Sequence, residues 1–212
     1  MIFDYIKNPE EIYKKSFDII TKEACLDKFS SDVQPLVIRL IHACGITEIV
    51  HNLVLTDGFI EKAKSILQKP CNIFCDTYMV TQGIIKKNVP EFCEIKCFIN
   101  EDKILEHSKN NHTTKAAAAV DFWNDGKDLQ NSIIVIGNAP TALFRLLEKI
   151  YQGLIKPGLI CAFPVGFVGA IESKQALIDM NADIPFITLK GRLGGSAMAS
   201  AVLNSLLIEF CT

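Results

Sequence analysis

Hydrophobic residues in the first third of the chain recur at helical spacing. The run 8–11, Asn-Pro-Glu-Glu, supplies a capping side chain, a proline for the first turn and two acids for the positive end of the helix dipole. Apolar residues between 12 and 20 then continue the helical pattern. The sequence predicts two further helices, one at about 32–44 and one near Asp57, with an apolar stripe formed by Phe59, Ile60, Ala63, Ile66 and Leu67.

From Cys71 onward, short apolar runs alternate with longer amphipathic segments. The runs predict five strands, at 72–75, 95–99, 132–137, 159–163 and 185–189. The segments between and after them predict helices near 78–85, 113–123, 141–151, 170–180 and 196–208. This alternation indicates an α/β fold: a three-layer, doubly wound, mainly parallel five-stranded sheet, with 132–137 as its central strand. We expect one domain, 1–212, with a helical N-terminal extension (1–70) and a doubly wound part (71–212).

Composition and charge narrow the class of protein. Hydrophobic residues make up 49% and charged residues 22% of the 212 positions, which is typical of a soluble globular protein. The net charge of -2 gives no basic field for nucleic acid. The N-terminus lacks the pattern of a signal peptide, and the weakly polar stretch 158–171 is too short and too interrupted to span a membrane. These features predict a cytoplasmic protein without a membrane partner.

The eight cysteines could suggest a disulfide framework or a metal site. Without a secretory signal they are expected to be reduced thiols. Cys71/Cys75 and Cys93/Cys97 share one spacing, but both pairs lie in strand-like runs and neither has a histidine at ligand spacing. Buried structural thiols are therefore favoured, and no metal is expected.

Polar and small residues follow each predicted strand. Ligands of doubly wound sheets bind outside the carboxyl ends of the strands, so this edge is the expected site. The run 190–196, Lys-Gly-Arg-Leu-Gly-Gly-Ser, combines Lys190 and Arg192 with glycines and a helix start, which favours anion binding. The alternative is a tight turn with exposed basic residues. A nucleotide is disfavoured because neither common phosphate-binding glycine motif is present.

Other residues at this edge allow two readings each. Asp76 is a candidate carboxylate or a loop cap, and Asn138 reaches a ligand or caps the following helix, with capping favoured. Lys115 opens an alanine-rich helix whose small side chains suit either a flat ligand or another subunit, although alanine is also the best helix former. The other three histidines are expected to be surface or loop residues: His51, His107 and His112.

Arg39 and His42 lie three residues apart in an apolar run that ends at Gly45. In a helix they share one face, and Gly45 supplies a left-handed stop. A permanent cation beside a histidine suits anion binding with proton transfer, whereas a lone histidine on an apolar helix is more often structural. The residues alone thus predict a polyanion-binding protein with His42 as the acid/base group.

Six segments, taken in order, resemble the precorrin-8X and cobalt-precorrin-8 methylmutase family (precorrin isomerases). They span nearly the whole chain, at 39–45, 75–84, 113–120, 136–144, 164–174 and 190–197. The resemblance implies a flavodoxin-like fold, a homodimer, no cofactor, and a tetrapyrrole substrate whose methyl group migrates from C-11 to C-12 in cobalamin synthesis.

The resemblance also implies roles for individual residues. His42 would be the proton donor and acceptor, and Ser16 and Arg39 would bind substrate. Many substrate carboxylates suit scattered cations, here Arg39, Lys115, Lys190 and Arg192. One departure is that Thr114-Lys115-Ala116 stands where the family usually has Thr-Arg-Ser, which removes a bidentate fork and a hydroxyl. A non-catalytic corrinoid carrier is the alternative function, and a flavin-binding electron carrier is a third.

Overall fold

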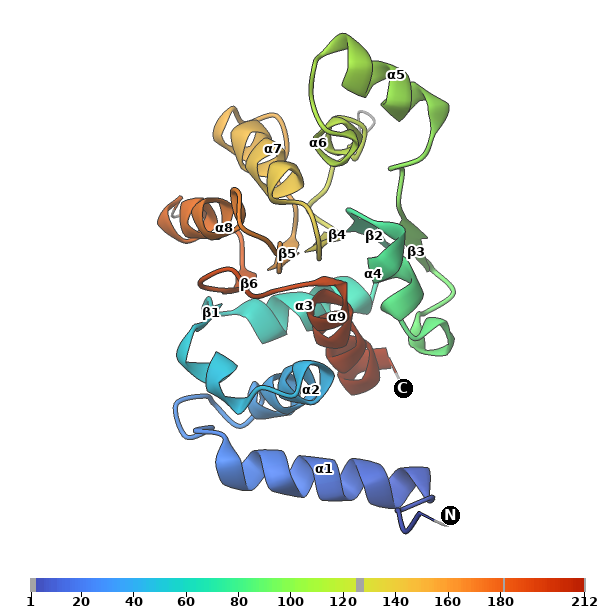
Figure 1. Cartoon of the computed structure of the whole chain (residues 1–212). Coiled ribbons are helices and arrows are strands. Elements are labelled where there is room, and N and C mark those ends of the chain that lie inside the picture. The colour runs from blue at the N-terminus through green and yellow to red at the C-terminus, as the bar shows by residue number, and fades with distance from the viewer. Residues whose placement is uncertain (1–2, 125–127, 181, 212) are drawn as a thin grey trace.

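The computed structural model describes residues 3–124, 128–180 and 182–211. Its helices and strands alternate after a helical start, as Figure 1 shows. In chain order they are α1 (Pro9–Glu23), α2 (Gln34–Cys44), the 3-10 helix η1 (Thr47–His51), β1 (Leu53–Leu55), α3 (Phe59–Leu67), β2 (Cys71–Cys75), α4 (Tyr78–Gly83), η2 (Lys86–Asn88), β3 (Cys93–Lys96), α5 (Asp102–Asn110), α6 (Lys115–Val120), β4 (Ser132–Ile136), α7 (Pro140–Tyr151), β5 (Leu159–Ala162), α8 (Ala170–Asp179), β6 (Phe186–Leu189) and α9 (Ser196–Cys211).

The described strands form one sheet in the order β1-β6-β5-β4-β2-β3. The five predicted strands are present and pair in parallel, and β4 lies in the interior of the sheet with all five residues buried. The mainly parallel α/β prediction is confirmed, but the sheet has six strands rather than five. The sixth, β1, pairs antiparallel with β6, with Leu53 opposite Leu189.

The extra strand corrects the expectation of a wholly helical 1–70 part. Leu53-Val54-Leu55 is too short to show a period of two, and all three residues are only half-buried. The segment becomes a strand because the outer edge of β6 offers free backbone partners, which is a tertiary effect that local sequence does not reveal.

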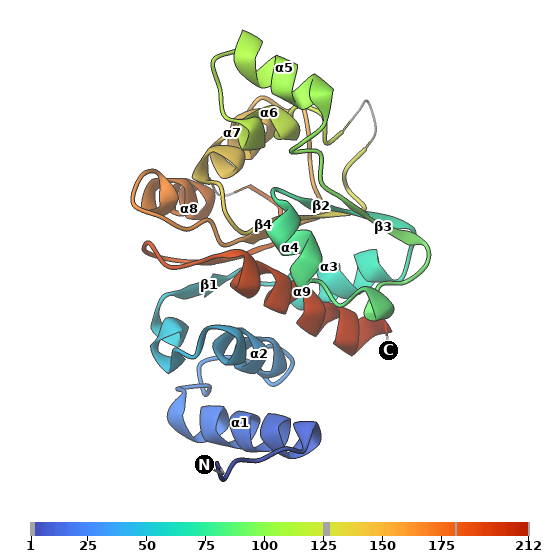
Figure 2. The same cartoon turned by 45° about the vertical axis from the view of Figure 1, so that its right-hand side comes forward.

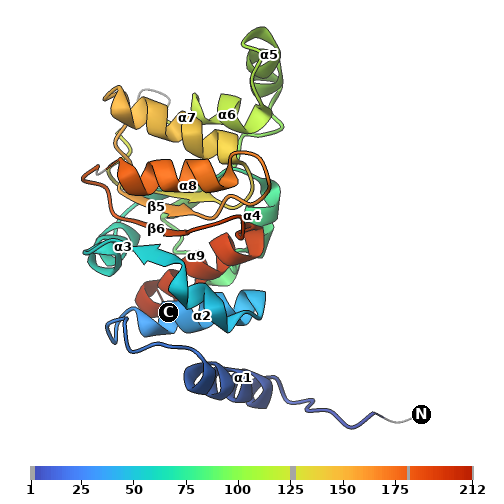
Figure 3. The ribbon, with the colours of Figure 1, turned by 60° about the vertical axis from the view of Figure 1, so that its left-hand side comes forward.

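Helices cover both faces of the sheet (Figures 1 and 2). α6, α7 and α8 lie on one face, and α3, α4 and α9 lie on the other. α2 packs against α9, and α1 packs on α2 as an outermost layer (Figure 3). α9 is apolar on most sides, which suits its position between the sheet and α2. No helix of the described residues is long and apolar enough to cross a membrane.

The pattern of hydrophobic positions also missed α5. This helix is rich in charge and fully buries only Ile104, so it shows almost no apolar stripe. His107 therefore lies in a helix and is half-buried, rather than being an unpartnered surface or loop residue. Its Nε2 donates to Oδ2 of Asp121 at 2.9 Å, while Nδ1 accepts from Asn111 at 3.2 Å. His51 and His112 are exposed, as predicted.

Asp121 connects three helices on this face. Besides His107 of α5, its carboxylate accepts from Nε and Nη2 of Arg145 on α7, each at 2.8 Å, and lies 3.4 Å from Nζ of Lys149. Burial by itself raises the pKa of Asp121, but the hydrogen bonds from Arg145 and His107 outweigh it and hold the pKa below its usual value. The carboxylate thus holds α5 and α6 against α7.

Asp121→Asn should destabilise the fold by about 1–3 kcal/mol, because it weakens charge-assisted hydrogen bonds at a mostly buried site. Since the folded-state pKa is depressed, the stabilisation is complete above about pH 4 and is lost as the pH falls through the folded-state pKa. Thermal unfolding measured from pH 7 to pH 3 should show the difference between wild type and variant shrinking in acid. Asp183→Asn, which removes only a solvent-exposed ion pair with Lys156, should match wild type throughout. Equal stability of Asp121→Asn and wild type at pH 7 would contradict this account.

Candidate active site

His42 lies at the C-terminal end of α2, on the side that the core leaves open. Leu36, Val37, Leu40 and Ile41 bury the opposite side of α2 in the main hydrophobic core. Gly45 ends the helix with φ +70°, and its N–H donates to the carbonyl of Ile41 at 2.7 Å. The left-handed stop predicted at Gly45 is confirmed, and His42 is exposed in the last turn.

Helix α1 surrounds the imidazole of His42 on two sides. The ring of Tyr13 stacks on it with centroids 5.3 Å apart and planes 29° apart, and Phe17 meets it edge-on at 5.6 Å. Ser16 places its Oγ 2.8 Å from Nδ1. These three residues share one face of α1 because their spacing is i, i+3 and i+4. The aromatic contacts and the hydrogen bond together fix the plane of the ring.

Arg39 belongs to the same cluster. Its guanidinium lies over the ring of Phe17, with Cζ 5.6 Å from the centroid, so Arg39 and His42 both contact this one side chain. The structure therefore brings together Ser16, Arg39 and His42 from the predicted set. Sequence reasoning missed Tyr13 and Phe17, although their spacing from Ser16 on α1 was a usable signal.

The hydrogen bond from Ser16 leaves the second ring nitrogen of His42 available. No hydrogen bond with any described residue engages Nε2. The Ser16 hydroxyl donates to Nδ1 when Nε2 carries the proton, and it accepts from Nδ1–H when that nitrogen is protonated. As an imidazolium, the ring gives a proton from Nε2 while the Ser16 hydroxyl accepts from Nδ1–H, and Nε2 takes the proton back with that contact unchanged.

A pocket of about 380 Å³ opens beside His42, between the N-terminal segment, α1 and the end of α2. Its walls are mainly aliphatic and also include Ser16, His42, the cation Lys15 and the anion Glu23. Such a lining suits a mainly apolar ligand. The apolar lining includes Ile6, Ile12, Ile19, Ile20 and Ile41.

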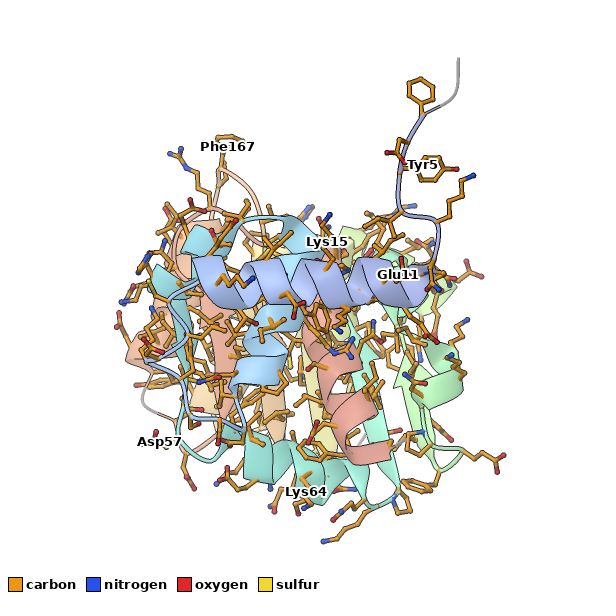
Figure 4. The ribbon with its side chains drawn as sticks, turned by 90° about the horizontal axis from the view of Figure 1, so that it is seen from below. Tyr5, Glu11, Lys15, Asp57, Lys64 and Phe167 are labelled. Atoms are coloured by element: carbon orange, nitrogen blue, oxygen red, sulfur yellow. The ribbon has the colours of Figure 1, made fainter. Side chains whose placement is uncertain are left out.

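The carboxyl edge of the sheet holds the remaining predicted residues. In Figure 4, Phe167 and Tyr5 project from the same edge of the molecule, one near each end, with Lys15 between them on α1. The side chains of Lys115, Asn138, Lys190 and Arg192 are exposed. Within the described residues, none of these four forms a hydrogen bond with Ser16 or His42.

The turn between β6 and α9 carries Lys190 and Arg192. It passes so close to the loop after β5 that a Cβ on Gly194 would lie 2.4 Å from the carbonyl oxygen of Phe163. The guanidinium of Arg192 covers the ring of Phe167, with Cζ 5.1 Å from the centroid. The predicted glycine turn with exposed cations is therefore present, and its binding role stays a prediction.

Asp76 acts as a loop cap, one of its two predicted roles. The side chain is 1% exposed, and its two oxygens accept from the backbone N–H groups of Gly137, Asn138 and Ala139 at 2.8–2.9 Å. Burial raises the pKa of Asp76, and the three amides oppose that rise. Because loop amides already occupy both oxygens, Asp76 shapes the site rather than contacting a ligand.

The favoured role of Asn138 as a side-chain cap is wrong. The N-cap of α7 is Ala139, which supplies no side-chain hydrogen bond, and Asp76 satisfies the loop amides instead. Asn138 is left exposed beside the carboxyl end of β4.

Lys115 is exposed at the first position of α6. Before it, Thr114 accepts from the N–H of Ala117 at 3.1 Å and bonds the hydroxyl of Thr141 at 2.8 Å, which joins α6 to α7. The alanines at 116–119 are all buried within the subunit. Their small size therefore serves packing inside the chain, and only Lys115 is presented outward.

Comparison with known proteins finds relatives of this chain among the precorrin-8X and cobalt-precorrin-8 methylmutases. The family model for precorrin-8X methylmutase matches residues 11–209. A precorrin-8X methylmutase from a Sinorhizobium species is 41% identical over 204 residues, covering 96% of each chain, and a cobalt-precorrin-8 methylmutase from Salmonella typhimurium is 36% identical with 96% of each chain covered. A solved precorrin-8X methylmutase from Thermus thermophilus superimposes with a TM-score of 0.84 at 33% identity, covering 95% of this chain and 96% of that one. The chain belongs to the precorrin-8X methylmutase family.

Ser16→Ala should lower kcat about tenfold, the value of one hydrogen bond of about 1.4 kcal/mol, because Nδ1 of His42 loses its partner. Steady-state methylmutase kinetics measure the effect. Thr21→Ala is a matched control on the same helix, since that hydroxyl bonds only the backbone carbonyl of Phe17 in the described structure. Equal kcat values for Ser16→Ala and Thr21→Ala would show that the Ser16 contact does not support His42.

Proposed function

We propose that this chain moves a methyl group from C-11 to C-12 of precorrin-8X or cobalt-precorrin-8, with hydrogenobyrinate or cobyrinate as the product. Membership of the family makes it a methylmutase, an isomerase of cobalamin biosynthesis. The observation that carries the proposed mechanism is the imidazole of His42, which is fixed through Nδ1 and open at Nε2 beside an apolar pocket.

In the proposed reaction, His42 protonates the macrocycle through Nε2. The added proton draws electron density from the conjugated system, so the bond from the methyl group to C-11 breaks as the bond to C-12 forms. The proton then returns to Nε2, and the product has the same atoms and oxidation level as the substrate. The chemistry therefore needs general acid catalysis, typically worth about 10²–10⁴-fold, and no external nucleophile.

The substrate would lie across the carboxyl edge of the sheet. A tetrapyrrole exceeds the 380 Å³ pocket, so one apolar edge of the ring enters beside His42 and the rest extends over the loops. Arg39, Lys115, Lys190 and Arg192 would then meet carboxylates at the periphery of the ring. Arg39, already seated on Phe17, is the cation of this set that is joined to the His42 cluster. Lys115, which replaces the usual arginine, offers a point charge without a bidentate fork.

His42→Ala should leave the fold and corrinoid binding largely intact and lower kcat by about 10²–10⁴-fold. The assay follows the absorbance of substrate in excess over protein, with metal-free and cobalt-containing substrate measured side by side. Exposed His51, changed to alanine, is the control and should keep wild-type turnover. Near-normal turnover of His42→Ala would remove His42 from the mechanism. A stoichiometric absorbance shift without conversion by wild type would indicate a carrier instead of an enzyme.

We also infer a homodimer in the cytoplasm. The eight free thiols agree with a reducing compartment. Phe167 and Val168, adjacent in the loop after β5, leave apolar side chains exposed at 84% and 89%, and adjacent exposed apolar side chains are typical of a contact surface. Light scattering coupled to size exclusion should give twice the chain mass of 23.5 kDa, and a mass of one chain would contradict the dimer.

A further inference from the structure

Lys174 is a lysine on α8 whose side chain is 0% exposed. Its neighbours on the same helix, Ala170, Ser173 and Leu177, are buried as well. The ammonium Nζ donates to the backbone carbonyl of Leu193 at 2.7 Å. In the described part of the chain, no carboxylate forms an ion pair with it.

A buried ammonium without a counter-ion is unfavourable. Loss of hydration penalises the charged form, and burial accordingly lowers the pKa of Lys174 to about 8. An apolar side chain of similar length would fill the same space without that penalty. The hydrogen bond to the Leu193 carbonyl offsets part of the cost of burying the ammonium. The position of Leu193 in the fold therefore indicates what Lys174 does.

Leu193 lies in the centre of the turn 190–195 that carries Lys190 and Arg192. Glycines at both ends of this turn have positive φ, +89° at Gly191 and +120° at Gly195, so local backbone preferences hold it only weakly. Two backbone bonds tie it to the loop after β5: Gly195 N–H to the Phe163 carbonyl at 2.8 Å and Gly166 N–H to the Arg192 carbonyl at 3.3 Å. A further backbone bond joins the N–H of Lys190 to the carbonyl of Asn52 at 2.8 Å, and Lys174 adds a side-chain tie from α8.

We propose that Lys174 is a positioning residue: its buried ammonium holds the carbonyl of Leu193 and thereby fixes the turn 190–195 at the carboxyl edge of the sheet. Through this tie the rigid helix α8 sets the direction in which Arg192 and Lys190 point. The consequence for substrate binding rests on the proposed function, since it assigns those two cations to carboxylates of the corrin precursor.

Limited trypsin digestion of the folded protein tests the tie without any substrate. Trypsin cleaves after lysine and arginine, so it reports directly on opening at Lys190 and Arg192. Lys174→Met, which keeps the length and removes the donor, should raise the cleavage rate at these two bonds about tenfold, because local opening becomes easier by about one hydrogen bond. Lys174→Arg, which keeps a cationic donor, should restore much of the protection.

Lys149→Met is the matched control. Lys149 is also a buried lysine, on α7, but its ammonium contacts Asp121 and not the turn. It should leave cleavage at Lys190 and Arg192 unchanged. Thermal unfolding verifies that each variant is folded, and Lys174→Leu, which also lacks a donor, replaces the Met variant where that one does not fold.

Methylmutase kinetics of the same variants separate the inference from the function on which it rests. Lys174→Met should raise KM about tenfold and change kcat by less than about threefold, because the turn binds and does not react. Faster cleavage with unchanged KM supports the tie and contradicts the assignment of Lys190 and Arg192 to the substrate. Cleavage at the wild-type rate in folded Lys174→Met, or in folded Lys174→Leu, overturns the proposal.

Discussion

The packing of α2 against α9 is the contact on which the site depends. Burying one side of α2 in the core beneath the sheet fixes the opposite side toward α1, and that side carries Arg39 and His42. The sheet holds α9, and α9 in turn holds α2. The imidazole of His42 is therefore attached to a rigid helix although it is exposed to solvent. α1 then supplies the aromatic contacts and the hydroxyl that orient the ring. The candidate acid/base group thus lies on a helix, and the turn between β6 and α9 carries the exposed cations Lys190 and Arg192.

Two buried charged groups at the sheet edge fix loops rather than face solvent. Asp76 uses both carboxylate oxygens to shape the loop after β4, and Lys174 uses its ammonium to hold the turn after β6. Each group is removed from solvent, and each has its pKa shifted by burial. Groups of this kind place loops accurately, as the proposed contacts of several cations with one substrate would require.

Much of the fold was predictable because long amphipathic segments and five apolar runs carry strong periodic signals. β1 and α5 were not, since a three-residue strand has no period and α5 fully buries only Ile104. Within the site, Arg39 and His42 were predictable from their spacing and the stop at Gly45. Tyr13 and Phe17 share one face of α1 with Ser16, a spacing that was a usable signal, but their contact with His42 appears only when α1 lies across α2. Ser16 was predicted only from the resemblance to precorrin isomerases, because neither composition nor spacing singled it out.

The most direct test of proton transfer by His42 is a single-turnover measurement of methyl migration in H₂O and in D₂O. Excess enzyme removes product release from the observed rate. The account predicts a rate that is about twofold or more slower in D₂O for the wild type, because the transferred proton exchanges with solvent through Nε2. It also predicts that this isotope effect disappears in His42→Ala. Equal wild-type rates in the two solvents would contradict the account.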